Sequence, residues 1–142
     1  MDPINYDKLK LSLKRLQERY SDYLASEQRT GLLESDRESI KESCIQRFEV
    51  CFDTLWKHLK KYLETAEGLT DVPGSPNGVF KSAFVAKVID SAELWIDFNQ
   101  KRGATSHDYS GIKADETFAI IGEFISHAVR LYEYMTGEIW QK

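Results

Sequence analysis

The 142-residue sequence has no apolar run that approaches the ~18–20 residues of a membrane-spanning helix. Its first residues carry neither the basic nor the apolar segment of a secretory signal peptide. Cysteines and histidines nowhere have the spacing of a zinc site, and we find no convincing strand pattern and no internal repeat. These absences, with the chain length, predict one cytoplasmic domain over residues 1–142 that holds no metal and no cofactor.

Only two cysteines are present, Cys44 and Cys51. They are seven positions apart in one helical pattern, which separates them by about 10 Å along a helix axis. A disulfide needs Cα atoms within about 7 Å, so the two cannot bridge to each other. We expect both to be small residues of the core or its boundary.

Acidic residues outnumber basic ones, and the net charge of −4 argues against a protein that coats nucleic acid through bulk electrostatics. A local basic groove is not excluded by this balance. The basic residues form two clusters: Lys8, Lys10, Lys14, Arg15 and Arg19, and then Lys57, His58, Lys60 and Lys61. Each cluster is either a solvated helix face or a contact surface for an anion.

Apolar residues recur at steps of three and four along most of the chain, which is typical of amphipathic helices. The predicted helices cover about 5–26, 35–68, 76–88, 90–103, and a last segment that begins between 107 and 115 and ends at 137. Ser35-Asp36-Arg37-Glu38 has the pattern of a capping box, and Ser75-Pro76 that of an N-cap followed by proline. The predicted fold class is all-α, an up-and-down bundle of four to five helices.

Arg102 and His107 are the residues with the clearest chemistry, because arginine grips phosphate oxygens and histidine moves protons near neutral pH. In an unbroken helix the two would point roughly 140° apart. Convergence requires a break, which Gly103 can supply as a cap or kink. Thr105 or Ser106 could then cap the next helix and make an anion site beside His107.

RNA cleavage without a metal needs a base, an acid and a cation for the phosphorane. Arg102 and His107 supply two of these roles, and a symmetric homodimer would bring a second pair to the same cleft. A plainer explanation is also open, since an arginine near a helix end complements the helix dipole and a loop histidine is usually solvated. His58 and His127 have no partner in a sequence motif.

Several short motifs lie in a specific order between Leu9 and Tyr134. They are Ile45-Gln46-Arg47-Phe48-Glu49, Trp56-Lys57, Leu59-Lys60, Phe80-Lys81, Ala83-Phe84, Ile89, Trp95-Ile96-Asp97, and Arg102 followed by Thr105-Ser106-His107-Asp108-Tyr109. In this order they resemble the HEPN proteins known as nucleotidyltransferase substrate-binding proteins, which are small helical partners of minimal nucleotidyltransferases (MNT).

The resemblance implies a homodimer with a metal-independent ribonuclease motif, in which Arg102 stabilises the phosphate and His107 is the general acid and base. In toxin–antitoxin members, the MNT antitoxin silences the toxin by AMP transfer to a tyrosine just after the histidine, where this chain has Tyr109. Family members often have asparagine directly after the arginine, and Gly103 cannot orient the arginine in that way. The supporting residues are Ser106 and Asp108, and the candidate RNA contacts are Lys57, Lys60, Lys61 and Lys101.

Three functions follow from these observations. We favour a toxin of a HEPN/MNT pair, an endoribonuclease that acts on tRNA or mRNA. The alternative is a non-enzymatic subunit that presents a substrate or nucleotide to a minimal nucleotidyltransferase, with Arg102 and His107 only binding phosphate. The third is a structural dimerisation module in which both residues are replaceable.

Overall fold

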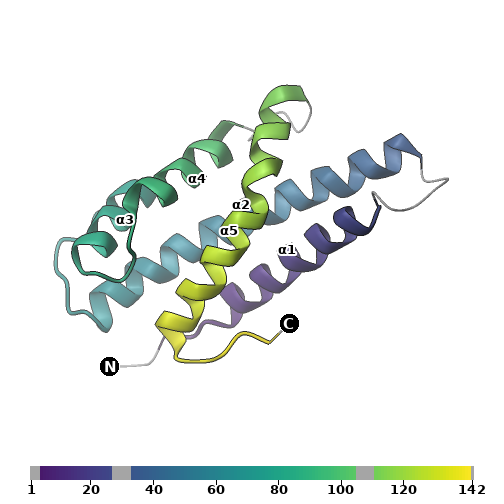
Figure 1. Ribbon diagram of the computed structural model, residues 1–142. Coiled ribbons are helices and arrows are strands. Elements are labelled where there is room, and N and C mark those ends of the chain that lie inside the picture. The colour runs from purple at the N-terminus through teal and green to yellow at the C-terminus, as the bar shows by residue number, and fades with distance from the viewer. Residues whose placement is uncertain (1–3, 27–32, 105–110, 142) are drawn as a thin grey trace.

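The computed structural model describes residues 4–26, 33–104 and 111–141, and all regular secondary structure within these ranges is α-helical (Figure 1). The helices are α1 (Asp7–Ser26), α2 (Glu34–Thr65), α3 (Pro76–Val85), α4 (Ala92–Ala104) and α5 (Gly111–Thr136). The predicted all-α class is therefore confirmed, with five helices over the described residues. None of these helices is both long and apolar enough to cross a membrane.

The 32-residue helix α2 is the element around which the others are arranged. Figure 1 shows α1 along one side of α2 and the α3–α4 pair along the other, while α5 crosses between them. Over the described residues α1 contacts α2 and α5 but neither α3 nor α4. The α1–α2 pair and the α3–α4 pair therefore present separate outer faces.

The centre of the core is an aromatic cluster around Phe124 of α5. Its ring centroid lies 4.9 Å from that of Phe48 and 6.1 Å from that of Phe52, both on α2. On α4, Phe98 and Trp95 have centroids 5.4 and 6.0 Å from that of Phe124. Most of these contacts are edge-to-face, the favoured geometry for aromatic rings. One side chain thus fixes three helices relative to each other.

The two cysteines are buried on the core side of α2 and are not linked, as the sequence predicts. Burial raises the pKa of both thiols, Cys44 and Cys51, to about 12. A thiol with so high a pKa is almost entirely protonated near neutral pH and is a poor nucleophile. Their role is therefore packing.

One of the two predicted helix caps is confirmed and the other is wrong. Ser75 is the N-cap of α3, its hydroxyl accepting from the Gly78 amide at 3.4 Å, and Pro76 follows as the first helical residue. The capping box at Ser35 does not form, because α2 already begins at Glu34 and its N-cap is Leu33, which makes no side-chain cap bond. Acidic residues in that first turn complement the helix dipole instead.

Helix α3 ends earlier than predicted because the backbone turns at Lys87, whose φ is +65°. The Val88 amide donates to the Ala83 carbonyl at 2.9 Å, and the Lys87 amide donates to the Phe84 carbonyl at 3.0 Å. This pair of bonds is the Schellman pattern, in which glycine normally occupies the left-handed position. A lysine in this left-handed conformation is sterically strained, because its Cβ crowds the backbone, whereas glycine has no Cβ.

Replacing Lys87 with glycine is therefore expected to stabilise the fold by about 0.5–1 kcal/mol, since the relieved backbone strain exceeds the extra entropy of an unfolded glycine. The matched control is Lys81→Gly in the middle of α3, which should destabilise by about 1 kcal/mol. Urea unfolding followed by circular dichroism measures both. A Lys87→Gly variant as destabilised as the control would contradict the left-handed turn.

Candidate functional site

The last turn of α4 carries Arg102, and α2 supplies the surface beneath it. The guanidinium carbon lies 5.0 Å from the centroid of the Phe52 ring, which is fully buried. A cation over an aromatic face is attracted by the ring quadrupole, and arginine stacks there readily. Arg102 is half-buried, so its planar fork of donors is placed at the edge of the core rather than in open solvent.

Two asparagines orient the same guanidinium: one is hydrogen-bonded to it, and the other is hydrogen-bonded to the first. Nε and Nη2 of Arg102 donate to Oδ1 of Asn99, at 3.3 and 3.0 Å. Nδ2 of Asn99 in turn donates to Oδ1 of Asn77, at 3.0 Å, so α3 fixes the amide that fixes the arginine. Because Arg102 is held from two sides, binding an anion costs it little additional side-chain entropy. The arrangement is suited to phosphate, the anion whose geometry matches a guanidinium.

The beginning of α5 is fastened to the end of α4 beside this arginine. The buried Thr117 donates its hydroxyl to the carbonyl of Lys101 at 2.9 Å, which satisfies an acceptor that the end of a helix leaves without an intrahelical partner. The Lys101 ammonium lies 3.9 Å from a carboxylate oxygen of Glu116. These contacts set where α5 starts relative to Arg102.

An ion pair between Lys41 of α2 and Asp115 of α5 holds the beginning of α5 against α2. Burial by itself would lower the pKa of Lys41, but the hydrogen bond and attraction to Asp115, with Glu38 nearby, raise the pKa above its ordinary value. The Lys41 ammonium also lies 5.9 Å from the Phe118 ring centroid. Lys41 therefore carries its charge near neutral pH and holds α5 against α2.

Residues 4–137 match the model of a family described as nucleotidyltransferase substrate binding protein like. The chain belongs to this family. A search of curated protein sequences finds no match.

Two solved structures have a similar fold. One, from Thermus thermophilus, is 26% identical and covers 91% of this chain and 96% of its own, with a TM-score of 0.67. The other, from Haemophilus influenzae, is described as the fold of a substrate binding domain of a nucleotidyltransferase. It is 20% identical, covers 92% of this chain and 98% of its own, and has a TM-score of 0.80.

The family prediction is confirmed. His107, Ser106, Asp108 and Tyr109 lie outside the described residues. Among the described residues α4 extends to Ala104 and α5 begins at Gly111, and the predicted break between Arg102 and His107 lies outside them. The backbone of Gly103 is helical, and Ala104 continues the helix. Gly103 is therefore not the helix cap that we expected.

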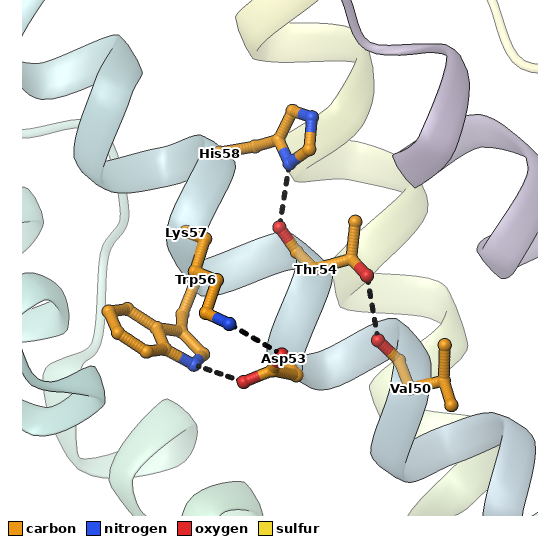
Figure 2. Close-up of polar contacts among 6 residues, drawn as sticks. All are labelled: Val50, Asp53, Thr54, Trp56, Lys57 and His58. Carbon is orange, nitrogen blue, oxygen red and sulfur yellow. Dashed lines mark hydrogen bonds and ion pairs between the residues drawn. The ribbon is translucent and has the colours of Figure 1, made fainter.

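The four candidate RNA contacts of this family member fall in two places. Lys101 is beside Arg102 at the end of α4, whereas Lys57, Lys60 and Lys61 line a hollow on α2. Lys61 is nine residues from Phe52, which puts it on the opposite face of α2 from the ring under Arg102. In that hollow, Asp53 accepts from the Lys57 ammonium at 2.9 Å and from the Trp56 indole N–H at 3.2 Å (Figure 2).

The remaining two histidines have structural surroundings. His58 is buried, with Nδ1 2.8 Å from the carbonyl oxygen of Thr54 (Figure 2) and Nε2 3.2 Å from that of Asn5. It therefore links α2 to the chain preceding α1. His127 lies 4.0 Å from Glu123 and packs beside the aromatic rings of α4. Within the described residues, no group of three or more potential metal ligands is gathered.

Sequence reasoning missed the two asparagines that orient Arg102. Asn99 lies three residues before Arg102, and this spacing on a helix is a signal that the sequence contains. Asn77 is 22 residues away from Asn99, and no local pattern connects the two. Gly103 follows the arginine in this chain, and Asn99 makes an orienting contact from one turn upstream.

Removing the Thr117 hydroxyl tests the fastening of α5 to α4. Thr117→Val should lower the free energy of unfolding by about 1–2 kcal/mol, because the Lys101 carbonyl loses its donor in a buried site. Thr117→Ser keeps the hydroxyl and should cost less. Urea unfolding of the two variants decides the matter, and a valine variant as stable as the wild type would show that the bond contributes nothing.

Proposed function

We propose that this protein is the substrate-binding partner of a separate nucleotidyltransferase, and that Arg102 binds a phosphate of the substrate or nucleotide. Membership of the family over residues 4–137 supports the partnership. The fold supports it too, since the Haemophilus influenzae protein of similar structure is described as a nucleotidyltransferase's substrate binding domain. In this assembly the transferase carries out the chemistry, and the helical chain positions what is to be transferred or modified.

The observation that carries the proposal is the prior orientation of Arg102. Its guanidinium lies over the ring of Phe52 and is hydrogen-bonded to Asn99. An arginine that only complemented the helix dipole would need neither contact. The lysine beside it, Lys101, adds positive charge to the same end of α4.

AMP binding tests the phosphate site directly. In two-dimensional ¹H–¹⁵N NMR, AMP should shift backbone amides at the end of α4. Arg102→Gln should weaken binding about tenfold or more, because a hydrogen bond to a charged group contributes about 1.5–3 kcal/mol. Asn99→Ala should weaken it less, since the charge stays and only its orientation is lost.

The control for this titration is Lys81→Gln, which removes an exposed charge from α3. Equal AMP affinity in wild type and Arg102→Gln would reject the phosphate site. The partnership is tested separately by affinity purification of the tagged chain from its own cells. Recovery of a nucleotidyltransferase in a stoichiometric complex is expected, and its absence would reject the partnership.

A second function is RNA cleavage by the isolated protein, and the oriented guanidinium of Arg102 at the end of α4 favours it. In this proposal Arg102 stabilises the phosphorane, His107 transfers the proton, and a homodimer supplies the second pair of groups. AMP on Tyr109 would then place a phosphate within reach of Arg102 and block the substrate site.

Incubation of purified cellular RNA with the unmodified protein in excess EDTA separates the two functions. If the protein is a ribonuclease, the wild type cuts and folded His107→Ala and Arg102→Ala variants lose at least a hundredfold in rate. Transfer of AMP to Tyr109, confirmed by intact mass, should abolish the cutting. Intact RNA with an unmodified wild type would reject the ribonuclease and leave the binding subunit.

A further inference from the structure

The two basic clusters of the sequence meet on the outer face of the α1–α2 pair. Two adjoining hollows share Lys8 and Thr54 among their lining residues, one of about 760 Å³ and one of about 220 Å³. We call them together the α1–α2 groove. Its lining from α1 includes Lys8, Leu11, Ser12 and Arg15, and its lining from α2 includes Arg47, Val50, Asp53, Thr54, Trp56, Lys57, Lys60 and Lys61.

The groove is basic although the chain is acidic. Its cations are Lys8, Arg15, Arg47, Lys57, Lys60 and Lys61, against two lining carboxylates, Asp7 and Asp53, in a chain of net charge −4. Lys57 is paired with Asp53 and Lys60 with Glu64. The other four cations have no ion pair within the described residues. The cations of this surface outnumber its carboxylates, which favours the binding of an anion.

Surfaces for flat, apolar groups lie between the charges. Trp56 is half-buried, and Asp53 fixes its indole ring by accepting its N–H (Figure 2). Leu11 and Val50 are 49% and 54% exposed in the smaller hollow. Grooves that bind single-stranded nucleic acid combine a basic track for the backbone with aromatic and apolar surfaces for the bases. The α1–α2 groove has both parts.

The length and position of the groove favour a strand over a small anion. Arg47 and Lys61 are fourteen residues apart on one helix, a distance of about 21 Å. Neither α3 nor α4 contacts α1 in the described parts, and Gly74, just before α3, lines one edge of the larger hollow. A protein partner would require a broader apolar centre than Leu11 and Val50 provide, because charge is depleted at the centre of protein interfaces.

We propose that the α1–α2 groove binds single-stranded nucleic acid through its phosphates, at a site separate from Arg102. Phosphates follow the row from Arg47 and Arg15 through Lys8 to Lys57 and Lys61, and a base stacks at Trp56. The basic row lies on the face of α2 away from Arg102, since Phe52 beneath Arg102 points into the core while Lys61, nine residues later, lies on the opposite side of the helix. Trp56, one turn after Phe52, lies at the edge between the two faces. The inference does not depend on the function proposed above.

Fluorescence anisotropy with a labelled 15-nucleotide oligothymidylate tests the groove, and this DNA lacks the 2′-hydroxyl that RNA cleavage would use. The double variant Lys8→Gln/Lys61→Gln should lose about tenfold or more in affinity at low salt. The slope of log K against log salt should also shrink by about 1.4, at about 0.7 per lost phosphate contact. The control Lys81→Gln/Lys87→Gln removes the same charge beside α3 and should change neither quantity.

Four outcomes would overturn the proposal. The first is no binding by the wild type at low salt, and the second is an equal loss in the control variant. The third is equally good competition by polyglutamate of matched charge, which would assign the groove to an acidic protein segment. The fourth is loss of oligothymidylate binding in Arg102→Gln, which would place the strand at the end of α4. AMP titration of the same variants reports on Arg102 alone, so failure of one site is distinguishable from failure of the other.

Discussion

The packing of Phe124 against the rings of α2 and α4 is the contact on which the rest of the structure depends. Phe52 takes part in this cluster and also provides the surface under the Arg102 guanidinium. Protein interiors are close-packed, so a shift of α5 or α4 relative to α2 would be transmitted through these rings to the arginine. The candidate site thus takes its geometry from the core rather than from a surface loop.

Much of the fold follows from the spacing of apolar residues. The apolar repeat of α1 puts Leu9, Leu13 and Leu16 in the core, whereas Tyr20 and Tyr23 of the same repeat are half-buried. The start of α3 at Pro76 follows from its local sequence. The missed features depend on more than one segment. The capping box at Ser35 has the right pattern, but α2 begins before it. The last turn of chain, in which buried Trp140 donates to Gln17 of α1 at 3.1 Å, has no periodic signal at all.

The candidate site shows the same division. Arg102 is recognisable from the residue type and the motif. The hydrogen bond that holds Asn99 in place is not recognisable from the sequence, because Asn77 lies on another helix and meets Asn99 only in the folded chain. The contact from Asn99 explains why a glycine can follow the arginine at position 103. When an arginine is oriented from the preceding turn, the residue that follows it is no longer needed for that purpose.

Charge segregation connects the two faces of α2. In a chain of net charge −4, the basic lining of the α1–α2 groove would orient a polyanion as well as attract it. A strand held there would leave the end of α4 open on the other face of the molecule. Arg102 is held at the edge of an aromatic core, where its charge is less screened than that of a surface lysine. Under both proposals, one acidic helical bundle would hold a polymer by many weak, salt-sensitive contacts and a single phosphate by one oriented contact, without competition between the two.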